Sequence, residues 1–231
     1  ALDLLVEHDL LAIRSGHGVG KTTFLAWVII WFLSTRTPAK VGCTAPRGEQ
    51  IEQNLWPEIA RWMRNMPDDL REILNWTRKR VDVVGDHESF AVSSTTRPEN
   101  PIAFQGLHSA NFLLIVDEAS GVSEATFEAA ESLLTTANAK WVMTGNPNLR
   151  TGRFYRIFHD DRLMEEWQRI HVPCASVPGV SKQFIDRIAS THGVDSNQYR
   201  VRVLGEFPFD DEDTIIPSET VMSAIGRDIV I

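Results

Sequence analysis

One short glycine-rich segment limits what this chain can fold into more than any other feature. Residues 15–22 read Ser-Gly-His-Gly-Val-Gly-Lys-Thr, and they stand between an apolar run at residues 10–14 and a longer apolar stretch at residues 22–34. Apart from Ser15, which replaces the usual first glycine, this is the pattern of a phosphate-binding loop between a strand and a helix. The segment therefore predicts an α/β nucleotide-binding fold.

The residue types in this loop match the chemistry of a nucleoside triphosphate. Glycines allow backbone N–H groups to close around phosphate oxygens, and the start of the helix adds positive potential. Lys21 is expected to reach the β- and γ-phosphates, and the Thr22 hydroxyl to bind Mg²⁺. The predicted nucleotide contacts are Ser15, Gly16, His17, Gly18, Val19, Gly20, Lys21, Thr22 and Thr23.

Two carboxylates follow a second apolar run, at residues 113–116. The carboxyl ends of parallel strands meet at one edge of a sheet, so Asp117 and Glu118 are expected beside the phosphate loop. Asp117 is predicted to hold Mg²⁺, directly or through water, and Glu118 to orient and deprotonate the attacking water. Adjacent Asp and Glu also favour the class of phosphate-loop enzymes with an additional strand between the two motif strands. The strand expected at residues 41–44 is available for that place.

A third polar motif, Thr-Gly-Asn-Pro at residues 144–147, ends another apolar run. Asn146 is in a position to sense the γ-phosphate, although the same residues also form ordinary turns that touch no nucleotide. Arginine candidates for a further positive charge are Arg14, Arg97, Arg150 and Arg153, with solvated or ion-paired roles as the alternative.

The wider pattern predicts a three-layer α/β fold with a mainly parallel central sheet and helices on both faces. Short apolar runs alternate with stretches of helical period, which is typical of strand-helix-strand units. Expected strands are residues 10–14, 41–44, 112–116, 141–144 and 168–172, with a hairpin of 81–84 and 90–93, and expected helices are 22–34 and 49–65. Trp27 and Trp31 are assigned to the core because they are one turn apart on an apolar helix.

Charge and composition exclude several classes of function. The chain has 231 residues, a net charge of −8 and two cysteines, so diffuse phosphate binding, a disulfide framework and a zinc site are all disfavoured. Residues 61–80 carry six basic and three acidic side chains with Trp62 and Trp76 between them. This segment indicates either a DNA-backbone contact or, as the favoured interpretation, a solvated helix face. His108 is expected to be a turn residue rather than a nucleotide contact.

Several motifs in order resemble the ATPase domain of the large subunit of tailed-bacteriophage terminases, the motor that packages DNA. They are residues 15–22, Thr44-Ala45-Pro46-Arg47 with Gln50, Asn54 and Trp56, residues 105–108 before 116–119, residues 145–147 with 152–155, and Val-Leu-Gly-Glu-Phe-Pro at 203–208. The chain departs from that pattern at His17 and Gln105, where many members have arginine.

The resemblance implies a RecA-like fold that hydrolyses ATP with Mg²⁺ and drives double-stranded DNA into a prohead. The implied partners are DNA, the terminase small subunit, the portal and further copies in a ring, in the host-cell cytoplasm and without a membrane. Residues 1–205 would be the ATPase domain and residues 206–231 an acidic linker toward a nuclease domain, so the chain is interpreted as part of a longer protein without nuclease activity of its own.

Two other functions stay open on the sequence. Asp117-Glu118-Ala119-Ser120 is similar to the acid box of superfamily 2 helicases, which need a second motor domain. A nucleotide-dependent binding or assembly module without hydrolysis is the other alternative, although such a module has no need for a base such as Glu118.

Overall fold

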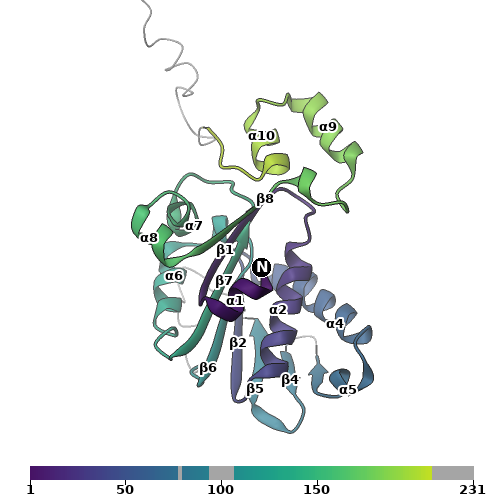
Figure 1. Ribbon diagram of the computed structural model, residues 1–231, viewed down its shortest axis with the longest axis vertical. Coiled ribbons are helices and arrows are strands. Elements are labelled where there is room, and N and C mark those ends of the chain that lie inside the picture. The colour runs from purple at the N-terminus through teal and green to yellow at the C-terminus, as the bar shows by residue number, and fades with distance from the viewer. Residues whose placement is uncertain (78–79, 94–106, 210–231) are drawn as a thin grey trace, which may run out of the picture.

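A computed structural model describes residues 1–77, 80–93 and 107–209, and its centre is one eight-stranded sheet (Figure 1). The strand order is β3-β4-β5-β2-β6-β7-β1-β8. The strands are β1 (Leu10–Ser15), β2 (Ala39–Thr44), β3 (Leu74–Trp76), β4 (Arg80–Val83), β5 (Asp86–Ser93), β6 (Asn111–Val116), β7 (Asn138–Gly145) and β8 (Gln168–Val172). The six strands β5, β2, β6, β7, β1 and β8 pair parallel with their neighbours in this order. The pairs β3–β4 and β4–β5 are antiparallel. The predicted strands and the predicted hairpin are confirmed.

Helical segments cover both faces of this sheet. Their bounds are α1 (Leu2–Glu7), α2 (Lys21–Thr35), α3 (Gly48–Gln50), α4 (Trp56–Arg64), α5 (Asp68–Arg71), α6 (Glu124–Glu131), α7 (Gly152–Ile157), α8 (Asp161–Glu166), α9 (Lys182–His192) and α10 (Asn197–Tyr199). Shorter or wider turns form η1 (Ile51–Leu55), η3 (Ala119–Gly121), η4 (Cys174–Ser176) and η5 (Arg200–Leu204). The helix expected at 49–65 is thus a succession of α3, the wide turn η1 and α4.

Strand β6 shows why the sheet has a core on each side. Leu113 and Ile115 are fully buried among residues of α1, α2 and α4, whereas Phe112 and Leu114 are fully buried among residues of α6 and α7. Successive side chains of a strand point to opposite faces, so a strand covered on both sides is apolar throughout. Figure 1 shows α2 and α4 on one side of the sheet and α6, α7 and α8 on the other.

The strand between the two motif strands is β7 and not the strand at residues 41–44, which the sequence makes available for that place. β7 pairs with β1 and with β6, while β2 lies on the far side of β6, next to β5. Strand order depends on which crossover packs on which face, and apolar runs of similar length do not encode it. The additional-strand class is nevertheless confirmed, with Asn146 following the additional strand itself.

Trp27 is 41% exposed, so its assignment to the core is wrong. Helix α2 is apolar around most of its circumference, so not all of its apolar side chains face the core. Trp27 there packs edge-on against Trp62 of α4, with ring centroids 4.9 Å apart. Trp31 is only partly buried and packs against the same core.

The last described elements lie over the carboxyl edge of the sheet (Figure 1). Cys174, Ile188 of α9 and Val203 of η5 form a small buried cluster against which Val19 packs. Residues 206–209 continue from it, and Phe207 is buried against the rings of Phe154 and Tyr155. The rest of the predicted linker, residues 210–231, lies outside the described residues. In the described part of the chain, every helix is too short or too polar to cross a lipid bilayer.

Candidate active site

The glycine-rich segment forms a loop that joins β1 to α2. Gly18 and Gly20 have φ values of 71° and 92°, and α2 begins directly at Lys21. A helix of 15 residues whose first turn has no acidic side chain directs its unpaired N–H groups and its positive dipole end at the loop. The local structure therefore agrees with the phosphate-binding loop that the sequence predicts at this place.

The acid pair follows β6, as expected for ligand-binding residues at the carboxyl edge. Asp117 is 8% exposed, and its Oδ1 accepts hydrogen bonds from the Thr144 hydroxyl at 2.7 Å and from the Glu118 N–H at 2.9 Å. Thr144 belongs to β7, so the additional strand directly orients the Asp117 carboxylate. This contact between two of the motifs could not be read from the sequence.

Glu118 has an unusual backbone and a perturbed carboxyl group. Its φ of 50° and ψ of 43° place it in the left-handed region, which costs a residue other than glycine about 1–2 kcal/mol. Burial raises the pKa of Glu118, Lys21 opposes this, and the neighbouring Asp117 adds to it. Strained backbone and shifted titration together are typical of catalytic positions.

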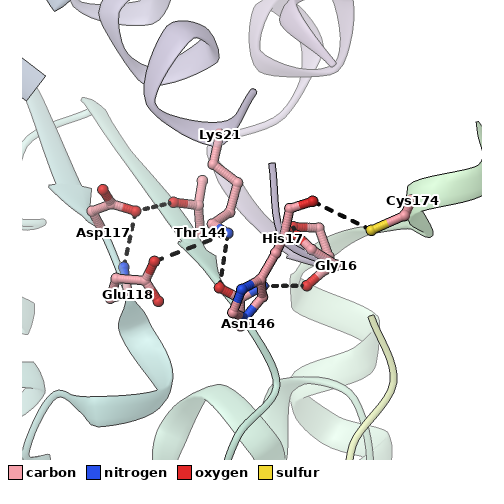
Figure 2. A network of polar contacts seen from close by, with 9 residues as sticks. Gly16, His17, Lys21, Asp117, Glu118, Thr144, Asn146 and Cys174 are labelled. Atoms are coloured by element: carbon pink, nitrogen blue, oxygen red, sulfur yellow. Dashed lines mark hydrogen bonds and ion pairs between the residues drawn. The ribbon is translucent and has the colours of Figure 1, made fainter. Parts of the chain in front are cut away.

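Lys21 connects all three predicted motifs. Its Nζ donates to Asn146 Oδ1 at 3.0 Å and lies 3.9 Å from Glu118 Oε1. Asn146 in turn donates from Nδ2 to the Ser15 carbonyl oxygen at 2.7 Å. Figure 2 shows these side chains converging from the loop, from the end of β6 and from the end of β7. The Asn146 side chain therefore contacts both the loop and its lysine.

His17 lies against α9 and η5, which are among the last described elements. The His17 ring stacks on Phe184 of α9, and the backbone N–H of His17 donates to the Arg202 carbonyl oxygen at 2.8 Å. Burial lowers the pKa of His17, as do the nearby charges of Lys21 and Arg202, so the ring is neutral at pH 7. Cys174 Sγ also lies 3.3 Å from the carbonyl oxygen of His17 (Figure 2).

An open cavity of about 550 Å³ lies beside the phosphate loop. Residues 17–23 of the loop line it with Glu118 and Asn146, and so do Glu58 and Arg61 of α4. Sequence reasoning missed both α4 residues as parts of the site. A glutamate and an arginine at i, i+3 are common on exposed helices, and only the packing of α4 beside α2 brings them to this cavity.

Glu58 is held by three donors at one oxygen. Its Oε1 accepts from Thr23 Oγ1 at 2.6 Å, from Arg61 Nη2 at 2.6 Å and from Trp62 Nε1 at 2.8 Å. Although burial acts in the opposite direction, these bonds hold the pKa of Glu58 below its usual value. The carboxylate therefore ties the first turn of α2 to α4.

Mg²⁺ fits the oxygen donors at this edge. Thr22 lines the cavity, and Asp117 directly precedes Glu118, which lines it as well. Mg²⁺ prefers carboxylate, hydroxyl, phosphate and water oxygens. Among the described residues there is no cluster of three or more histidine, cysteine, aspartate or glutamate side chains that could hold a metal ion by itself. Such a sparse donor set suits an ion that is shared with nucleotide phosphates.

The predicted arginines that the structure describes, Arg14, Arg150 and Arg153, do not line this cavity. Arg14 lines a separate cavity beside β8, and its guanidinium lies over the rings of Phe158 and Phe207. Arg150 donates to the Phe209 carbonyl oxygen, and Arg153 pairs with Glu124 and Glu131. Arg97 and Gln105 are outside the described residues. Arg14 faces α7 and α8 because Ala12 and Arg14 share the sheet face opposite α2.

The remaining candidates have local structural partners. His108 lines a cavity with Lys40 and His87, apart from the phosphate loop. In the basic segment 61–80, Arg71 pairs with Asp68 and Arg80 with Asp82, while Trp76 donates to the Trp56 carbonyl oxygen. Arg78 and Lys79 lie outside the described residues.

The strand order and the glycine-rich loop before α2 give this chain the fold of the additional-strand, RecA-like class of phosphate-loop NTPases. No family model matches the chain. A protein of Enterobacteria phage P7 described as "Probable terminase, large subunit" is 25% identical over 230 residues, which are 95% of this chain and 47% of that protein. The chain thus spans about half the length of this curated relative.

Solved structures agree with this similarity. The large terminase of a thermophilic bacteriophage in complex with ADP superposes with a TM-score of 0.70 at 16% identity, over 89% of this chain and 50% of that one. The large terminase ATPase domain of Thermus phage P74-26 gives 0.64 at 13% identity, over 85% and 87% of the two chains. The resemblance to the ATPase domain of terminase large subunits is therefore confirmed in sequence and in fold.

Proposed function

We propose that this chain hydrolyses ATP and uses the energy to move double-stranded DNA into a viral prohead, as the motor domain of a terminase large subunit. The observation that carries the proposal is the position of the Lys21 ammonium, 3.0 Å from Asn146 Oδ1 and 3.9 Å from Glu118 Oε1. A lysine that binds phosphate, a base and a polar group that touches both the loop and the lysine are the parts that nucleotide-driven motion requires.

The residues of the site have separate roles in this proposal. Backbone N–H groups of the loop and Lys21 bind the β- and γ-phosphates, and Glu118 accepts a proton from the water that attacks the γ-phosphate. Thr22 and Asp117 would hold Mg²⁺, which neutralises phosphate charge when it is bound. Burial raises the pKa of Glu118, which makes its carboxylate a stronger base than that of an exposed glutamate, and the nearby Lys21 ammonium acts in the opposite direction.

The partners and setting follow from the similarity to terminases. They are double-stranded DNA, the terminase small subunit, the portal of the prohead and further copies of the chain in a ring, in the host-cell cytoplasm. Residues 1–205 are proposed as the ATPase domain and residues 206–231 as a linker, and nuclease activity is not expected of these residues. The P7 relative, which this chain matches over 47% of its length, supports the assignment to a terminase large subunit.

Lys21→Ala tests whether the loop binds ATP. We expect ATP affinity to fall at least about 30-fold, because a charge-assisted contact from a lysine side chain that is only 10% exposed contributes roughly 2 kcal/mol or more. The measurement is titration of both proteins with a fluorescent ATP analogue and Mg²⁺. Lys182→Ala, which removes an exposed lysine from the start of α9, is the matched control. ATP binding by Lys21→Ala at the parental affinity would overturn the assignment of the site.

Asn146→Ala tests whether this residue reads the state of the nucleotide. Asn146 holds Lys21 and the Ser15 carbonyl in place, and an arriving γ-phosphate competes for that lysine. We expect ATP affinity to change less than about threefold while DNA-stimulated hydrolysis falls about tenfold or more, because coupling depends on differential contacts in the two states. The exposed Asn148, substituted by alanine, is the control. Equal losses in both quantities would indicate a purely structural role.

A further inference from the structure

Helix α4 brings an arginine to the wall of the nucleotide cavity. Arg61 lines this cavity together with loop residues 17–23 and Glu118. His17 carries no charge at pH 7 because its pKa is lowered. Among the described residues that line the cavity, Lys21 and Arg61 are therefore the side chains with a full positive charge.

Contacts within the site connect Arg61 to the start of α2, the helix that follows the phosphate loop. Its partner Glu58 also accepts the Thr23 hydroxyl at 2.6 Å, and Thr23 follows the predicted Mg²⁺ ligand Thr22. Glu58 thus connects Arg61 to the first turn of α2. Glu118, the proposed base, lines the same cavity, so water, base and arginine would surround one phosphate group.

We propose that Arg61 is a second phosphate-binding cation of this site and that its guanidinium contacts the γ-phosphate of bound ATP. The inference rests on the proposed function, because it requires ATP at the loop. A guanidinium has five N–H donors, and within the described part of the chain Arg61 gives one of them to Glu58, at 2.6 Å. The side chain is 55% exposed, so it is free to turn over the cavity while Glu58 still holds one edge of it.

A second cation would stabilise the transition state of phosphoryl transfer. Negative charge spreads over the oxygens of the transferred group, and preorganised cations stabilise it more in the transition state than in the ground state. A guanidinium binds two phosphate oxygens at once, which an ammonium does not. Arg61 would therefore act on ATP and on hydrolysis far more than on ADP.

The test compares Arg61→Ala with the parent in three measurements on the whole chain. We expect the affinity for ATPγS to fall five- to tenfold, the affinity for ADP to stay within twofold, and single-turnover hydrolysis of ATP to slow about 100-fold. Arg61→Lys keeps the charge but not the two-pronged geometry, so it should lie between parent and Arg61→Ala. Arg64→Ala removes an exposed arginine from the same helix and should match the parent in all three measurements.

Two results would overturn the role of Arg61. One is an equal loss of ATPγS and ADP affinity, which would mean that the arginine only supports the structure of α4. The other is parental ATPγS affinity and hydrolysis in Arg61→Ala while Lys21→Ala, measured in parallel, loses ATP; the proposed function would then stand without Arg61. A parent that binds no ATP would overturn the proposed function itself.

Discussion

Glu118→Gln is expected to bind ATP within about twofold of the parent and to hydrolyse it at least 100-fold more slowly. The amide has the shape of the carboxyl group but cannot accept a proton from the attacking water, and general-base catalysis contributes about 10²–10⁴-fold. Glutamine also keeps the backbone cost of the left-handed conformation nearly unchanged, so the variant should fold as the parent does. Equilibrium binding and single-turnover hydrolysis measure the two effects separately.

A matched control keeps this result specific. Glu128→Gln changes an exposed glutamate on α6, away from the residues that line the cavity, and should leave both quantities unchanged. Hydrolysis by Glu118→Gln at the parental rate would show that another group activates the water. A large loss of ATP binding would show instead that the carboxylate mainly positions Lys21, at 3.9 Å from its ammonium group.

Gly205→Ala is expected to destabilise the protein by about 2–5 kcal/mol and to weaken ATP binding at least tenfold. Gly205 has a φ of 68°, which costs other residues about 1–2 kcal/mol, and an added Cβ would lie 2.5 Å from the Gly16 nitrogen and 2.6 Å from the Ser15 carbonyl carbon. These are backbone atoms of the phosphate loop, so the clash adds an overpacking cost of about 1–3 kcal/mol and displaces the loop itself. Denaturant unfolding and ATP titration test the two effects.

Gly85→Ala separates backbone strain from the clash. Gly85 has a φ of 79° in the hairpin between β4 and β5, and an added Cβ there meets nothing within 4 Å. This variant should lose only the strain term, about 1–2 kcal/mol, and should bind ATP as the parent does. The close approach of Gly205 to the loop would be irrelevant if the two variants behaved alike.

The residues by themselves determined the chemistry of the main site. The glycine-rich loop with Lys21, the carboxylates after β6 and Asn146 after β7 were all predicted from local patterns, because each follows an apolar strand in a sheet whose carboxyl ends meet. The structure brings these three motifs together. The burial of β6 on both faces was also predicted from the sequence, since a strand that is covered on both sides requires an unbroken apolar run.

Only the tertiary structure decided which strand lies between the motif strands and which side chains from other helices reach the cavity. Nothing local distinguishes β2 from β7 as the neighbour of β1, because strand order is set by crossover packing. Glu58 and Arg61 enter the site because α4 packs beside α2. Trp27 of α2 contacts Trp62 of α4 and is still 41% exposed. Arg14 is directed away from the loop by the alternation of side chains along β1, one residue before the loop begins at Ser15. Local sequence specifies the elements and their chemical ends, whereas long-range packing specifies which of those ends meet.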